Sequence, residues 1–254
     1  MKTICLFLLL AFSLPVIGQQ PPLIPTPLPS GKLPAAAPAY CQWVVTFQYL
    51  PSKPTGSSNT SPTAPKKANA NDNRPSKIVV IKTGTVISQV IDTLCGRRSE
   101  SWLIGHFQLN RTSESKQLVE SNDDPANPDY ICVQTGDFSE FSWIGPGNYL
   151  GAQEWQGRMI LVFRNDTPGV TSKPLSDPQV ENSPSVPASA TSQLALIDAD
   201  SRLPALLQIG TETQIYEFTP LPKVVQPLPD EVKAHIDERK ERIRKMLTPP
   251  ARPF

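Results

Sequence analysis

The chain has 254 residues, a formal net charge of +1 and 29 prolines, about twice the usual proline share of roughly 5%. A nucleic-acid-binding protein usually carries a basic surplus or a basic stripe, and neither is present, so we expect no nucleic-acid partner. Proline-rich stretches take up so much of the chain that we expect a single core of about 130 to 150 residues rather than two domains.

Residues 1–18 have the composition of a secretory signal peptide. One lysine precedes an apolar run from Ile4 to Leu14, and small Gly18 stands just before Gln19. The run is shorter than the roughly 20 residues of a permanent transmembrane helix, and no second run follows. We therefore expect a protein that is secreted or periplasmic, within the cell envelope, with no transmembrane segment after signal cleavage.

Residues 19–40 carry seven prolines and no hydrophobic period, which predicts an extended proline-rich arm. The aromatic and β-branched residues of 41–50 predict a strand. The polar residues near 51–77 predict a mobile insertion. Residues 78–94 are rich in Val and Ile around Gly84, which predicts two short strands that meet at a turn.

Apolar and polar residues alternate over 101–111, which predicts one further strand. Two more strands are expected at 130–136 and 157–165. The stretches near 112–129 and 166–192 are rich in polar residues and proline, and we expect both to be mobile insertions.

Three apolar runs, 194–197, 203–209 and 214–218, predict a three-stranded meander. The last segment, 221–254, begins as a proline-rich connection and then predicts a helix from Asp230. Four apolar residues of this helix fall on one stripe: Val232, Ile236, Ile243 and Leu247. The sequence as a whole predicts a mainly β fold over 41–220, an antiparallel curved sheet or half-barrel, with one C-terminal amphipathic helix and long disordered proline-rich segments.

Asp198 and Asp200 form an Asp-x-Asp pair, which either holds a metal ion or turns a hairpin. The metal-binding form of this motif sits beside a nucleotide-binding α/β domain, and no such pattern is present. Aspartate also accepts hydrogen bonds from the backbone of a tight turn. We therefore expect a hairpin turn and no metal site.

Aromatic residues cluster between 138 and 155, and this cluster is either the edge of the core or a platform for an apolar or sugar ligand. We predict a concave ligand-binding surface, lined by residues such as Trp102, Ile104, Trp143 and Phe163.

Catalytic signatures are scarce. The chain has two histidines, and only His106 with Cys95 makes a Cys–His combination worth weighing. A carboxylate pair of the glycosidase type leaves no local signature. Three cysteines follow the signal peptide, and two of them could form one disulfide: Cys41, Cys95 and Cys132. We predict no catalytic residue and no cofactor.

The segment from Ala195 to Gly210, followed by 214–218, resembles the late hairpin of LolA-like periplasmic lipoprotein-carrier half-barrel proteins. Asp198, Leu203 and Pro204 carry the match. The Thr-Gly usual in that turn is replaced here by Ser and Arg. The resemblance implies an antiparallel half-barrel whose concave apolar face receives acyl chains, and it implies no catalytic residues.

These observations predict a non-enzymatic extracytoplasmic binding or carrier-type β module for a lipid or another apolar ligand. The first alternative is a structural or interaction protein of the cell envelope, which would reach an envelope protein partner through its proline-rich arms. The second alternative is a secreted hydrolase, which would require clustered carboxylates or a close approach of Cys95 and His106.

Overall fold

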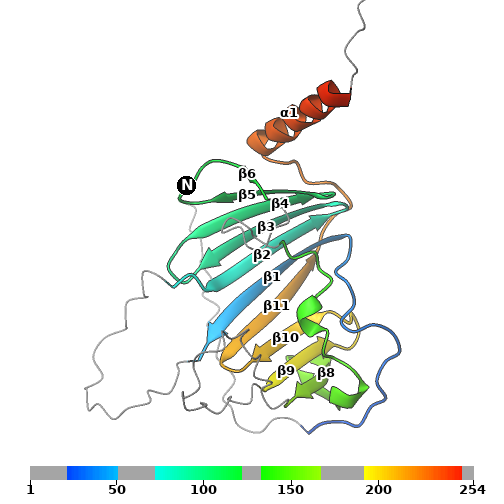
Figure 1. The fold of residues 1–254 in the computed structure, drawn as a ribbon. Helices are drawn as coiled ribbons and strands as arrows, with labels where there is room; N and C mark the ends of the chain where they lie inside the picture. The colour runs from blue at the N-terminus through cyan, green and yellow to red at the C-terminus, as the bar shows by residue number, and fades with distance from the viewer. Residues whose placement is uncertain (1–21, 51–71, 122–132, 167–191, 248–254) are drawn as a thin grey trace, which may run out of the picture.

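The computed structural model describes residues 22–50, 72–121, 133–166 and 192–247. Within these ranges, eleven strands form one open antiparallel sheet in the order β6-β5-β4-β3-β2-β1-β11-β10-β9-β8-β7 (Figure 1). One C-terminal helix lies against it. The expected mainly β fold, a curved antiparallel sheet with a single C-terminal helix, is confirmed.

The elements follow one another along the chain with short turns between most neighbouring strands. Their bounds are β1 (Tyr40–Tyr49), β2 (Pro75–Thr83), β3 (Val86–Thr93), β4 (Arg98–Ile104), β5 (Phe107–Thr112), β6 (Val119–Glu120), β7 (Tyr149–Trp155), β8 (Arg158–Asn165), β9 (Gln193–Asp198), β10 (Pro204–Ile209), β11 (Glu212–Pro220) and α1 (Asp230–Leu247). Two short 3-10 helices, η1 (Ser139–Phe141) and η2 (Pro146–Asn148), precede β7.

β1 and β11, the first and last strands along the chain, pair at the centre of the sheet. Cys41 lies opposite Pro220 at one end of this pair, and Tyr49 lies opposite Glu212 at the other. From β1 the strands run outward in chain order to β6, and from β7 they run inward to β11. The sheet is thus two meanders joined along one central pair.

The strand register assigns each side chain to one of two faces. Trp43 lies opposite Val80, which lies opposite Gln89, which in turn lies opposite Ser101. Directly paired residues share a face, so these four point to one side, which we call the aromatic face. Successive residues alternate, so Trp102 points to the other side, which we call the helix face.

Residues 133–144 and the arm residues 28–37 cover the aromatic face over the centre of the sheet. Phe138 contacts the rings of Trp43, Tyr216 and Phe218 edge-on, with centroids 5.8 to 6.2 Å apart. Trp43 and Phe141 are fully buried. Aromatic rings bury large apolar areas, so this cluster is the main core of the protein.

The arm joins this cover through a close backbone contact. The Ala37 amide donates to the carbonyl of Gly136 at 2.7 Å. Gly136 has a φ of +81°, and a Cβ there would lie 2.6 Å from that of Ala37, so only glycine fits. Further along the arm, Ile24 forms an antiparallel bridge with Ala152 of β7. The described part of the arm therefore packs on its own sheet.

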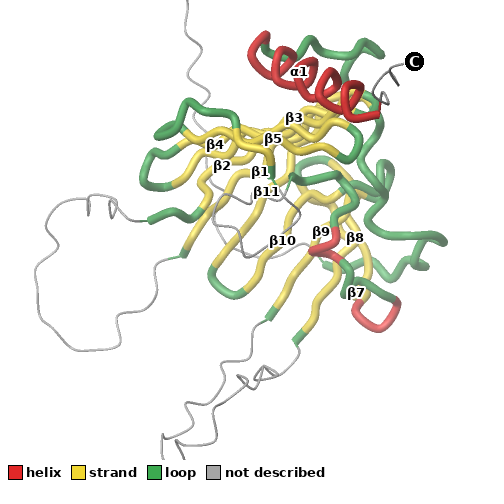
Figure 2. Tube along the Cα trace, turned by 45° about the horizontal axis from the view of Figure 1, so that its top comes forward, coloured by secondary structure: helices red, strands yellow, loops and turns green. Residues whose placement is uncertain are grey.

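The helix face is covered by α1 at the β3–β6 end. Val232 is fully buried and packs with Trp102 and Leu109, and Ile236 borders this cluster. Figure 2 shows α1 over this end of the sheet, while η1 and η2 lie toward β7–β9. The two covering elements thus lie over different ends of the sheet and on opposite faces.

The expected single strand over 101–111 is wrong, because the segment is a hairpin of β4 and β5. Gly105 has a φ of +63° in its two-residue turn, a conformation that favours glycine. β7 and the short β6 were not predicted either, and residues 133–136 form no strand.

Several expectations fall on residues outside the described ranges. These are the signal peptide, residues 130–132 of the expected strand, most of the expected insertions near 51–77 and 166–192, and residues 122–129 of the one near 112–129. Residues 113–120 form the loop after β5 and the strand β6. They lie inside the stretch near 112–129 that we expect to be a mobile insertion, and they are part of the described fold.

Candidate functional site

A groove with a volume of about 720 Å³ lies at the end of β3, β4 and β5. Its base is formed by Ile91, Ser99 and Asn110, which the register places on the aromatic face beyond the aromatic core. The loop after β5 closes one side. We call this the β3–β5 groove, and its other lining residues include Asn73, Thr93, Arg97, Arg98, Arg111, Thr112, Ser113, Glu114, Ser115, Gln117 and Val119.

The lining of this groove is polar and positively charged. It includes three arginines and one glutamate, a net charge of +2, together with hydroxyl and amide side chains. Such a lining offers many hydrogen-bond donors to a ligand. The groove therefore fits a small polar ligand with negative charge better than an acyl chain.

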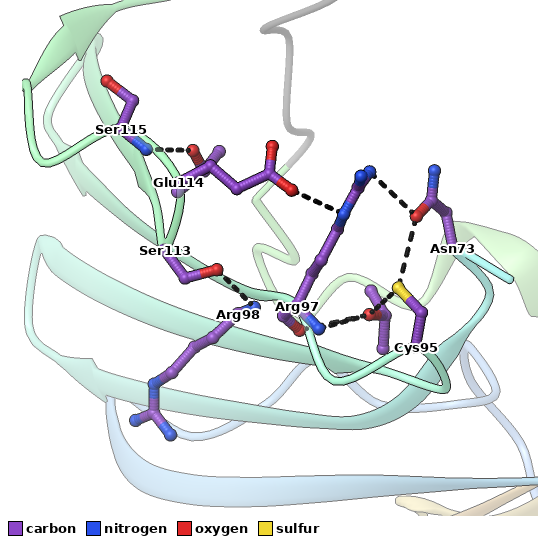
Figure 3. Close-up of polar contacts among 9 residues, drawn as sticks. Asn73, Cys95, Arg97, Arg98, Ser113, Glu114 and Ser115 are labelled. Carbon is purple, nitrogen blue, oxygen red and sulfur yellow. Dashed lines mark hydrogen bonds and ion pairs between the residues drawn. The ribbon is translucent and has the colours of Figure 1, made fainter. Parts of the chain in front are cut away.

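Arg97 ends the turn between β3 and β4, after Gly96, and Arg98 is the first residue of β4. The Arg97 guanidinium contacts Glu114 Oε1 at 2.7 Å and donates to Asn73 Oδ1 at 3.2 Å (Figure 3). The Arg98 side chain is 54% exposed, and its nearest carboxylates, those of Asp92 and Glu100, are both 3.5 Å away. Its register and these partners place the Arg98 side chain on the helix face, and Figure 3 shows it pointing away from Arg97, so Arg97 is the cation on the side of the groove base.

Cys95 lies beside this arginine turn, where Figure 3 shows its thiol directed toward Asn73. The thiol donates to Asn73 Oδ1 at 3.4 Å and lies 3.1 Å from the Thr93 hydroxyl. The hydrogen bond from Thr93, and more weakly the charge of Arg97, lower the pKa of Cys95. In contrast, burial raises the pKa of Cys41.

The Cys–His combination weighed from the sequence does not form. Cys95 precedes β4 and exposed His106 follows it, so the two stand at opposite ends of a seven-residue strand, about 20 Å apart at the usual rise per residue. Among the described residues, no group of three His, Cys, Asp or Glu side chains is arranged to hold a metal ion.

A second, smaller groove of about 320 Å³ lies next to the first and shares Arg98 and Arg111 with it. The Arg111 guanidinium contacts the carboxylates of Glu100 and Glu231, and these hydrogen bonds raise the pKa of Arg111. It also lies 5.4 Å from the ring centroid of Trp102. Arg111 therefore ties the first turn of α1 to the sheet, which is a structural role.

The four predicted ligand-binding residues do not share one surface. Trp102 and Ile104 lie together on the helix face, in the cluster that α1 covers. Phe163 is fully buried on the aromatic face near the other end of the sheet, and half-buried Trp143 borders the same aromatic core. Their role in ligand binding stays a prediction, divided between two separate clusters.

The expected hairpin at Asp198 is confirmed. Asp198 Oδ1 accepts hydrogen bonds from the amide and the hydroxyl of Ser201, both at 2.8 Å, and Asp200 is exposed beside it. Asp198 thus caps the turn from β9 into β10.

Both described cysteines after the signal peptide, Cys41 and Cys95, are free thiols. The third cysteine of the expected set, Cys132, lies outside the described residues. The Cys41 thiol donates to the carbonyl of Pro38 at 3.1 Å, so it fastens the end of the arm to β1.

The sequence analysis did not single out the residues of the β3–β5 groove. The one local signal is the Gly-Arg-Arg run at 96–98, in which a turn glycine precedes two adjacent cations. The remaining residues come from strands and loops that only the fold brings together.

Comparison with known proteins adds no relative: no protein-family model matches the chain, and no curated protein matches it. Of the helices that lie in the described ranges, none has the length and apolar content of a transmembrane span.

Proposed function

We propose that this chain is a non-enzymatic extracytoplasmic binding protein that holds a small, polar, negatively charged ligand in the β3–β5 groove. The observation that carries the proposal is the contrast between the two candidate surfaces. The aromatic face at the centre of the sheet is filled by residues 133–144 and the arm, whereas the groove is open and cationic.

The ligand class differs from the apolar one that the sequence predicts. Ligand pockets for lipids are lined mainly by hydrophobic side chains, with few polar groups. In the β3–β5 groove only Ile91 and Val119 are aliphatic, and charged or hydrogen-bonding groups make up the rest. Arg97, which is 47% exposed and contacts Glu114 of the lining, is the side chain best placed to meet the ligand's charge.

The test is native mass spectrometry of the protein purified from its own cell envelope, followed by separate aqueous and organic extraction. The double variant Arg97→Gln, Arg98→Gln is purified in parallel. We expect the wild type to carry an anionic molecule that is recovered in the aqueous extract, and the double variant to lose it. A charge-assisted hydrogen bond contributes about 1.5 to 3 kcal/mol, so the loss is about tenfold or more in affinity.

Arg158→Gln is the matched control. Arg158 lies at the other end of the sheet from the groove. Its side chain is 53% exposed, nearly the same as that of Arg98, and its carboxylate partner Asp198 is 3.6 Å away. This variant keeps the ligand if the groove binds it. An empty wild-type protein, or a lipid recovered in the organic extract of all three proteins, would contradict the proposal.

A second role, as an interaction protein of the cell envelope, is favoured by one observation. The last turns of α1 expose three large apolar residues, Ile243, Met246 and Leu247.

A further inference from the structure

The last turns of α1 leave the sheet on which the rest of the helix is docked, after Arg239 and Arg242 have contacted Glu120 of β6. Val232 is fully buried, whereas Ile243, Met246 and Leu247 are 41%, 77% and 78% exposed. In Figure 1 the helix begins beside β5 and β6 and continues beyond the edge of the sheet. The described residues thus leave the last turns of α1 without an apolar contact beneath them.

The exposed apolar residues continue the docked stripe. At about 100° per residue, Val232, Ile236, Ile243, Met246 and Leu247 fall within about 100° of the helix circumference. The first two form the interface with the sheet, and the last three prolong it by roughly 16 Å along the axis. The helix therefore has one apolar face, of which only the first part is used inside the protein.

The charges of α1 are divided along its length. Residues 230–238 contain four acidic side chains and one lysine, a net charge of −3, while 239–247 contain five basic side chains and one glutamate, a net charge of +4. Lys240, Arg244 and Lys245 are 72%, 77% and 76% exposed. Cations near a helix C-terminus interact favourably with the helix dipole, but this interaction does not explain the exposed apolar residues among them.

We infer that residues 239–247 dock on an anionic membrane surface. The exposed apolar residues would enter the headgroup region, and the flanking cations would meet lipid phosphates, as in other basic amphipathic helices. A second copy of the chain fits this surface less well, because the 239–247 segments of the two copies, each with a net charge of +4, would repel each other. The inference is independent of the ligand proposed for the β3–β5 groove.

The experiment is co-sedimentation of the full mature chain with vesicles that contain phosphatidylglycerol, compared with vesicles of phosphatidylcholine alone. We expect binding to the anionic vesicles only, and a fall in binding as salt is raised. Each basic residue near such a surface contributes about fivefold in partitioning, so Arg244→Gln with Lys245→Gln should weaken binding about 25-fold. Met246→Ser with Leu247→Ser should weaken it at least about tenfold.

Lys233→Gln is the matched charge control, because exposed Lys233 lies in the acidic half, about 18 Å from Lys245 along the helix. It should bind vesicles like the wild type. All substituted side chains are exposed, so circular dichroism and the unfolding temperature should not change. A wild type that fails to sediment with anionic vesicles at low salt, or a Lys233→Gln variant as weak as the Arg244 and Lys245 double variant, would overturn the inference. A wild-type protein that forms a dimer, which the Met246→Ser, Leu247→Ser double variant alone fails to form, would also overturn the inference.

Discussion

The centre of the sheet and its β3–β6 end are covered in opposite ways. Around β1 and β11, the chain's own segments cover the aromatic face with rings, and Trp43 and Phe141 are fully buried beneath or within this cover. At the β3–β6 end, α1 covers the other face instead. There the aromatic face bears buried polar residues, Gln89, Ser101 and Asn110, and leads into the β3–β5 groove.

Gln134 marks the boundary between these two regions. Its side-chain oxygen accepts from Trp43 Nε1 at 3.3 Å, and its backbone amide donates to Gln89 Oε1 at 2.8 Å. The covering segment 133–144 thus contacts Trp43 of the aromatic core and Gln89 of the polar region through the same residue. Strand alternation alone decides which face a side chain joins, and the covering segment decides whether that face is a core or a groove.

The largest expected effect lies in the aromatic region. Phe141→Ala removes a fully buried ring that contacts Phe138 and Tyr216 edge-on. We expect the free energy of unfolding to fall by about 3 to 5 kcal/mol, the usual cost of such a truncation. Urea unfolding followed by tryptophan fluorescence measures it, and a fall under about 1 kcal/mol would show that η1 contributes little to the core.

An intermediate effect is expected where α1 meets the sheet. Val232→Ala removes two buried methyl groups and should lower the free energy of unfolding by about 2 kcal/mol, mainly by loosening α1. Hydrogen exchange should accelerate in α1 while the amides of β1 and β11 keep their protection.

Ile243→Ala is the control on the same stripe of α1. This side chain is 41% exposed, so its truncation should change stability by less than about 0.5 kcal/mol. Equal effects of the two variants would contradict the division of α1 into a docked part and a free end.

The smallest effect, and one of opposite sign, is expected in the polar region. The Ser101 hydroxyl is buried and has no hydrogen-bond partner among the residues that the structure describes. Burying such a group costs free energy, so Ser101→Ala should leave stability unchanged or raise it by up to about 1 kcal/mol.

Ser201→Ala provides the contrast, because the Ser201 hydroxyl donates to Asp198 Oδ1 at 2.8 Å. Its loss should cost about 1 kcal/mol. Thermal unfolding of both variants measures the difference, and a destabilised Ser101→Ala variant would show that this hydroxyl has a partner after all.

Much of the sheet could be predicted because its strands are rich in β-branched and aromatic residues. The runs at β1, β8 and the β9–β11 meander, and the turn at Asp198, all follow from local composition. The helix α1 was equally clear, because its apolar residues fall on one stripe.

The β4–β5 hairpin could not be read from alternation alone. A two-residue turn at Gly105 and His106 reverses the chain, so Trp102 lies opposite Leu109 and shares its face. In a single strand these two residues would point to opposite faces. The polar–apolar pattern passes through the turn without a visible break, and only the glycine marks it.

The candidate site was harder still to predict. The base of the groove comes from three strands, and its rim comes from two loops and the residues before β2. No spacing along the sequence links Asn73 with Arg97 and Glu114. The covered aromatic face likewise depends on where the arm and residues 133–144 come to lie, which their proline and glycine content does not specify.

The pairing of β1 with β11 has a consequence for the order of folding. Cys41 and Pro220 meet across that pair although almost the whole domain separates them in sequence. Contacts of such long range form slowly, whereas the hairpins from β2 to β5 are local. The edge of β1 therefore stays open until the last strand has been synthesised, and this unpaired edge is where the growing chain is most exposed to aggregation.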